Sequence, residues 1–177
     1  MKKFVLGIIL GIILVPAIVA LYLASGRAPA ATTDPPMPFE RLIARTALRS
    51  KIHKEMPTAV PLPADEAAFL AGARVYRENC AMCHGLPHQP APVVSSGMFP
   101  KAPQLFDPNE MVADDPPGET FWKAKNGIRL TGMPGFASSL SDQQMWQVSL
   151  LLANADKLPA SVQQALVAPT TAAPAPK

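Results

Sequence analysis

The chain opens on a long apolar run. Residues 4–24 contain no charged side chain, and a helix of this length, at about 1.5 Å per residue, crosses the ~30 Å hydrocarbon core of a bilayer. Pro16 lies inside the run, and transmembrane helices tolerate such a proline. We predict a single membrane anchor over residues 1–25.

A cleavable signal peptide is the alternative for the same run. Lys2 and Lys3 would be its basic start, and the small residues 28–30 offer a cleavage point. The run is longer than the usual apolar region of about 7–15 residues, and the cleavage point lies several residues beyond its end. We therefore favour a retained anchor.

Residues 26–63 are predicted to form a linker followed by one helix. Ala, Thr and Pro dominate up to residue 38, whereas residues 39–54 have a helical pattern. The predicted helix has two faces. One carries the apolar residues Phe39, Leu42, Ile43, Ala47 and Ile52, and the other carries the arginines Arg41, Arg45 and Arg49. We expect the apolar group to pack on the following domain; an anionic membrane surface or a partner subunit are the alternatives. Three prolines in 56–63 end this segment.

Helical periodicity also marks both ends of the domain predicted over residues 64–159. Asp65 can cap a helix that runs to about Asn79, and Ala68, Gly72 and Tyr76 share one face of it. A glycine inside a helix suggests that another helix approaches closely.

The last helix of this domain begins with Ser141 and Gln144, which form a capping box, and Leu140 with Met145 fits a hydrophobic staple. A short helix fits residues 119–125, with Gly127 as its left-handed cap. No segment of the domain alternates as a strand does, so the predicted fold class is all-α. Residues 160–177 are rich in Ala and Pro and are predicted to be a disordered tail.

Charge divides the chain in the same way. The formal net charge is +3, yet the first 64 residues carry eight Lys and Arg against three acids, and residues 65–159 carry seven against ten. The basic balance is local to the appended segment. We therefore expect no nucleic-acid partner.

The chemistry-bearing motif is Cys80-Ala81-Met82-Cys83-His84. At this spacing two thiols can capture the two vinyl groups of one haem while the next residue ligates the iron. The chain has only these two cysteines. A zinc site would have to recruit His88 or His53, and a thioredoxin-like pair would need a preceding strand, so we regard both as weak alternatives.

Two segments, 72–85 and 126–136, resemble the class I cytochrome c family, and the likeness extends over residues 64–157. It implies a helical domain wrapped around one haem c, joined to Cys80 and Cys83, with His84 as an axial iron ligand. The first and last helices of the family cross near the haem. We therefore expect Gly72 and Tyr76 to contact Trp146.

The sixth iron ligand decides between an electron carrier and a haem that binds small molecules. The resemblance and the order along the chain favour Met133, in Gly132-Met133-Pro134-Gly135, because a thioether suits low-spin iron. Met98 has similar neighbours and is the alternative. His88 lies too close to His84 in sequence to reach the opposite face easily, and His53 precedes the domain.

A long proline-rich loop, residues 86–117, is expected to wrap the haem. In the family a proline carbonyl in this loop accepts the N–H of the iron-bound imidazole. Pro103 is the best match and Pro100 the alternative. The resemblance also assigns Tyr76, Phe99, Leu105 and Phe136 to the haem pocket, and ordinary core packing is the other reading for Phe99 and Leu105.

With both axial positions filled by protein, the expected function is electron transfer, not catalysis. Its partners would be redox proteins, and its place the cytoplasmic membrane, single-pass, with the haem domain on the periplasmic side. A haem subunit of a respiratory or dehydrogenase complex is the main alternative. A gas-binding haem protein is a further one, and it would require that Met133 does not ligate the iron.

Overall fold

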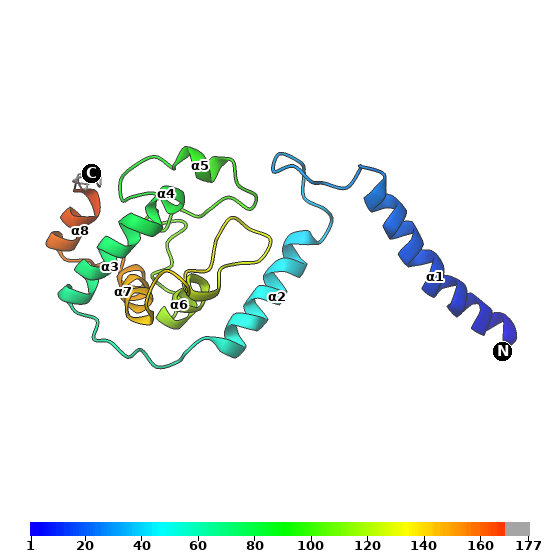
Figure 1. Ribbon diagram of the computed structural model, residues 1–177, viewed down its shortest axis with the longest axis horizontal. Coiled ribbons are helices and arrows are strands. Elements are labelled where there is room, and N and C mark those ends of the chain that lie inside the picture. The colour runs from blue at the N-terminus through cyan, green and yellow to red at the C-terminus, as the bar shows by residue number, and fades with distance from the viewer. Residues whose placement is uncertain (169–177) are drawn as a thin grey trace. The chain divides into compact units, whose positions relative to one another are not determined.

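The computed structural model describes residues 1–168, in which the regular secondary structure is helical and contains no strand (Figure 1). The helices are α1 (Lys2–Ala24), α2 (Glu40–Glu55), α3 (Glu66–Asn79), α4 (Ala81–His84), α5 (Val93–Ser96), α6 (Pro117–Asn126), α7 (Asp142–Leu152) and α8 (Ala160–Val167). They fall into two compact units, Met1–Ala44 and Arg45–Lys177. The all-α prediction is confirmed.

In the first unit, α1 is a continuous helix through Pro16. Within residues 1–168 it is the one helix long and apolar enough to cross a membrane, with a mean hydropathy of 3.0. A signal sequence near an N-terminus would meet the same criterion. The length and composition of α1 fit a single-pass anchor.

The second unit is built on the packing of α3 against α7. Asp65 caps α3 by accepting the N–H of Ala68 at 2.8 Å, and the predicted capping box of Ser141 and Gln144 starts α7. A Cβ on Gly72 would overlap the backbone carbonyl of Gln147. Gly72 is therefore the point at which the two helices come into backbone contact.

The aromatic contacts at this crossing differ from the prediction. Trp146 stacks on Phe121 of α6, with ring centroids 4.3 Å apart, whereas Tyr76 meets Phe106 edge-on at 5.1 Å. Trp146 and Tyr76 belong to separate buried clusters. The expected contact of Tyr76 with Trp146 is wrong, because the stacked partner of Trp146 lies on a third helix, α6.

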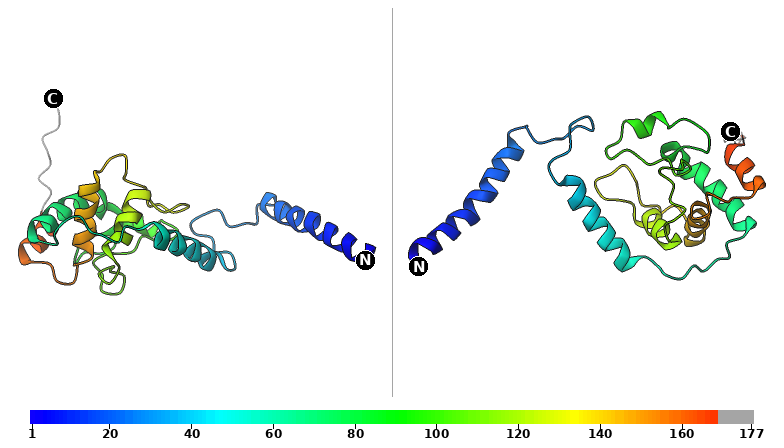
Figure 2. Two further views of the ribbon diagram at one scale, coloured as in Figure 1. Left: turned by 90° about the horizontal axis from the view of Figure 1, so that it is seen from below. Right: turned by 180° about the vertical axis from the view of Figure 1, so that it is seen from behind.

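The helix α8 packs on α3 and completes the core, as the two views of Figure 2 show. Val162 and Leu166 are fully buried, and Arg77 of α3 donates to the carbonyls of Ala165 and Ala168 at 3.0 and 2.6 Å. The prediction of a disordered tail is therefore wrong for residues 160–167. Val162 and Leu166, one helical turn apart, are buried against the core. The rest of that predicted tail, residues 169–177, lies outside the described part.

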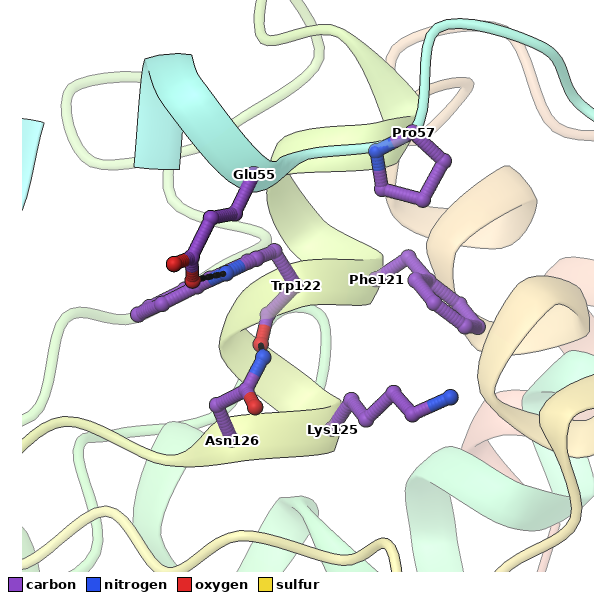
Figure 3. Close-up of a pocket in the computed structure, with 6 residues that line it drawn as sticks. All are labelled: Glu55, Pro57, Phe121, Trp122, Lys125 and Asn126. Atoms are coloured by element: carbon purple, nitrogen blue, oxygen red, sulfur yellow. Dashed lines mark hydrogen bonds between the residues drawn. The ribbon is translucent and has the colours of Figure 1, made fainter. Parts of the chain in front are cut away.

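The end of α2 also belongs to the second unit. Ile52 is buried, and a Cβ on Gly118 at the start of α6 would overlap the carbonyl of Pro57. Figure 3 shows the pocket at this junction, lined by Glu55, Pro57, Phe121, Trp122, Lys125 and Asn126. The compact unit thus begins at Arg45, before the predicted boundary at residue 64.

Candidate haem site

The Cys-x-x-Cys-His segment is a direct continuation of α3. Cys80 ends α3, where its N–H donates to the carbonyl of Tyr76 at 2.8 Å, and it also starts α4. The carbonyl of Cys80 accepts the N–H groups of Cys83 and His84 at 3.1 and 2.9 Å. One backbone turn therefore holds both thiols and the imidazole. Both cysteines are free and half-buried.

Tyr76 supports this turn from the core. Its hydroxyl donates to the carbonyl of Gly85 at 2.8 Å and lies 3.2 Å from that of His84. The side chain is fully buried, and burial raises the pKa of the phenol far above its usual value. Tyr76, which the resemblance assigned to the pocket, thus remains a hydrogen-bond donor that holds the backbone just after the cysteines.

The imidazole of His84 is oriented by the loop that follows it. Its Nδ1 lies 2.8 Å from the carbonyl oxygen of Pro103, and because a carbonyl can only accept, Nδ1 carries the hydrogen. Nε2 is then left with a lone pair for a metal. Burial lowers the pKa of His84, against the opposing effect of the Pro103 bond. Of the two prolines considered, Pro103 makes this contact.

Gln104 is a member of the site that the sequence analysis did not identify. Its side-chain amide donates to the carbonyl of Ala102 at 3.2 Å and lies 3.5 Å from that of Cys83. Gly85, with φ of +71°, leaves room for the amide, since a Cβ there would overlap it. A glycine directly after the motif is the signal that could have indicated this close approach.

Met133 lies on the loop between α6 and α7. Gly127 ends α6 with φ of +69°, and the loop then folds back so that the N–H of Ile128 donates to the carbonyl of Met133 at 3.1 Å. The hydroxyl of Thr131 accepts the N–H of Met133 at 3.1 Å. The half-buried Met133 therefore sits on a hydrogen-bonded loop, on a different element from His84.

The other candidates are distributed as follows. Leu105 is buried in the same cluster as Tyr76, and Phe99 is half-buried in the long loop. Phe136 packs against the cluster of α6 and α7 that contains Trp146. His88 and His53, the alternative ligands, are both exposed.

These side chains fit a covalently held haem. Two thiols share one turn, the neutral imidazole beside them has its Nε2 free, and a thioether lies on a separate loop. Cys80 is the more core-facing position, and burial raises the pKa of its thiol to about 12. Among residues 1–168, no three His, Cys, Asp or Glu side chains gather as a metal-ion site would require.

The comparison with protein-family models agrees with this geometry. The family model described as cytochrome C oxidase, cbb3-type, subunit III matches residues 67–150. A chain of the reducing HAO-like protein complex of Kuenenia stuttgartiensis is similar in structure, with a TM-score of 0.48 and 24% sequence identity. That match covers 57% of this chain and 49% of the other, so it spans about half of the solved chain. No curated protein matches significantly.

The helical core and the Cys-x-x-Cys-His turn define a class I c-type cytochrome domain. Residues 67–150 carry it, within the range 64–157 over which the sequence resembles that family. For residues 67–150, similarity to this family implies a covalently bound haem c and haem-based electron transfer.

Proposed function

We propose that this protein carries single electrons through one haem c with His84 and Met133 as axial ligands. The observation that carries the proposal is the bond from His84 Nδ1 to Pro103, because it presents Nε2 as a ligand beside two thiols on the same turn. The chain contains one Cys-x-x-Cys-His motif, which supports one haem.

The protein residues supply binding, orientation and a choice of ligand. When bound, the haem would supply the redox couple of its iron. Cys80 and Cys83 would hold the cofactor, the Pro103 carbonyl would make the imidazole a stronger ligand, and a thioether from Met133 would raise the potential relative to a second imidazole. With His84 and Met133 in both axial positions, no position at the iron would be open to a substrate, and the chemistry that the haem would supply is electron exchange.

We place the domain outside the cytoplasm, on a membrane anchored by α1. The length and hydropathy of α1 support the anchor, and large domains are translocated largely regardless of loop charge. Export precedes haem attachment in the family that the motif resembles. The location would be the periplasmic face of the cytoplasmic membrane, where redox partner proteins are met.

A second candidate is a haem subunit of a larger oxidoreductase complex. The name of the matching family model is that of an oxidase subunit, which favours this candidate. Isolation from native membranes in mild detergent separates the two: a free carrier runs alone, whereas a subunit brings stoichiometric partner chains.

The test of the proposed function starts with haem retention. The purified protein should keep its haem through acid-acetone extraction, and the double variant Cys80→Ala with Cys83→Ala should lose it, because each thioether requires a thiol. The reduced wild type should also bind carbon monoxide poorly, since Met133 closes the iron. Extractable haem would overturn the c-type assignment, and rapid carbon monoxide binding would favour a gas-binding protein instead.

A further inference from the structure

Residues 92–98, which we call the bridging segment, touch the neighbours of both proposed iron ligands. At one end, Pro92 Cδ lies 3.4 Å from the position that a Cβ on Gly85 would take, directly after His84. At the other end, the thioether of Met98 lies over Gly132, directly before Met133. The segment therefore joins the loop of His84 to the loop of Met133.

The bridging segment is short and internally bonded. Ser95 is fully buried; its hydroxyl and its N–H both donate to the carbonyl of Pro92, at 2.9 and 3.0 Å. The N–H of Met98 donates to the carbonyl of Ser95 at 3.3 Å. Met98 thus lies two residues after α5 (Val93–Ser96), and its backbone is bonded to the buried Ser95.

Met98 explains the glycine beside Met133. The φ of Gly132 lies outside the left-handed region, so its backbone does not require glycine. A Cβ at this position would lie 2.8 Å from the methyl carbon of Met98 and 3.2 Å from its sulfur. Gly132 therefore lets the flexible end of the half-buried Met98 side chain lie against the loop backbone, and an added Cβ would displace that end.

Residues 133–135 of the Met133 loop pack on the end of α6 around Gly127, whereas its tip, residues 128–132, is bonded to the loop itself. Between Ile128 and Met133 the structure shows backbone bonds only from Ile128 to Met133 and from Thr131 to Ile128, together with the hydroxyl bonds of Thr131. Leu130 has φ of +61° and is 92% exposed. An exposed loop tip opens more easily when no neighbouring side chain packs on it, and the side chain of Met98 lies over Gly132 in this tip.

We propose that Met98 is a positioning residue that holds the Met133 loop, so that the bond from Met133 to the iron resists replacement. The proposal rests on the proposed function, in which Met133 is the sixth ligand. Met98 itself does not bind the iron. Its flexible thioether fills the irregular gap above Gly132, and its loss leaves the loop free to move away from the haem.

The test measures how readily an added ligand replaces Met133. Imidazole is titrated into the oxidised holoprotein of the wild type, Met98→Ala and Met98→Leu. Met98→Ala should raise the imidazole affinity about tenfold, which is about 1.4 kcal/mol. Met98→Leu preserves volume and should stay within about twofold of the wild type. All three should keep the near-infrared charge-transfer band of methionine-ligated iron.

A second pair of variants tests the contact itself. Gly132→Ala introduces a methyl group into the space of Met98 and should raise the imidazole affinity in the wild-type background. In the Met98→Ala background the same substitution should have little effect, because the obstructing thioether is gone; such non-additivity is the signature of direct contact. Amide hydrogen exchange at Ile128, whose N–H is bonded to Met133, should be faster in Met98→Ala than in Met98→Leu.

Met133→Ala serves as the reference for complete opening. If it opens the iron while Met98→Ala binds imidazole as the wild type does, Met98 has no positioning role and the proposed function stands. If Met98→Ala itself abolishes the charge-transfer band, Met98 is a ligand and the positioning proposal is wrong. If the band survives in Met133→Ala, the assignment of the sixth ligand fails, and the positioning proposal fails with it.

Discussion

The indole N–H of Trp122 donates to a carboxylate oxygen of Glu55 at 3.2 Å, which ties the end of α2 to α6 (Figure 3). Lys51, one turn earlier, also pairs with Glu55, and this pairing lowers the pKa of the carboxyl group. Trp122 is buried whereas Glu55 is exposed. In this contact Trp122 contributes the buried packing, and Glu55 orients the indole through the hydrogen bond.

Trp122→Ala should lower the free energy of unfolding by about 3–5 kcal/mol, because it removes a buried aromatic ring from the junction of α2 and α6. Glu55→Gln should leave it nearly unchanged, because exposed ion pairs contribute little. Denaturant unfolding of the holoprotein in detergent, followed by circular dichroism, measures both. An equal loss in the two variants would show that the polar contact, not the packing, holds α2.

Gly72→Ala should destabilise the domain by about 1–3 kcal/mol, since the added Cβ would overlap the carbonyl of Gln147 and force α3 and α7 apart. Gly97→Ala is the matched control, because the nearest atom to a Cβ there is 3.7 Å away. Thermal unfolding compares the two. A Gly72→Ala variant as stable as Gly97→Ala would mean that the helices do not touch at residue 72.

Tyr76→Phe should reduce stability by about 1–2 kcal/mol at pH 8, because two carbonyls of the haem turn lose their hydroxyl partner. The deficit should shrink as pH rises above the usual tyrosine pKa of 10.0. The raised pKa keeps the phenol protonated in the folded wild type, while the unfolded chain ionises.

At pH 11 this ionisation should remove about 1.4 kcal/mol of the wild-type advantage. Denaturant unfolding of both proteins at pH 8 and pH 11 gives the comparison, and other titrating groups cancel because the two chains share them. A deficit that does not change with pH would mean that Tyr76 ionises equally in the folded and unfolded states.

Met133→Ala should abolish the near-infrared charge-transfer band, shift the spectrum towards high spin, lower the potential and let the reduced protein bind carbon monoxide. Met82→Ala is the control: Met82 lies between the two cysteines but is 70% exposed, so the band should persist. Absorption spectra of the oxidised and reduced proteins suffice. A band lost only in Met98→Ala would reassign the sixth ligand.

If α1 is a retained anchor, the protein should stay in membranes through a high-salt wash and should have an intact mass that includes residues 1–25. A variant in which a cleavable export signal replaces residues 1–25 should be released from the membrane and should keep an unchanged haem spectrum. A mass that begins near residue 31, recovered in the soluble fraction, would identify the segment as a processed signal.

Local signals in the sequence predicted the ends of helices well. Asp65, Ser141 with Gln144, and Gly127 act on backbone groups within a few residues of themselves, so their roles can be read without knowledge of the fold. Contacts that depend on three-dimensional packing were harder to predict from the sequence. Trp146 could be placed on an apolar face, but its partner Phe121 lies on a helix whose orientation no local pattern determines.

The site divides in the same manner. Cys80, Cys83 and His84 are adjacent, and their spacing alone indicates their chemistry. Gln104 and Met98 act across the long loop, and neither residue type marks such a role in a single sequence. The helix α8 was missed because Ala and Pro around residue 160 resemble the low-complexity segment that follows, although Val162 and Leu166 carry a helical apolar pattern.

The haem turn grows out of α3, the helix that is packed by α7 and also by α8. Cys80 is both the C-cap of α3 and the N-cap of α4, so a haem held at Cys80 would be fastened to a helix that packs on both α7 and α8. Opening of the turn at Cys80 would separate its side chain from the buried cluster that contains α3 and α7 residues. We therefore expect the amides of Cys80, Cys83 and His84, each of which donates to a backbone carbonyl, to exchange with solvent as slowly as the core amides of α3.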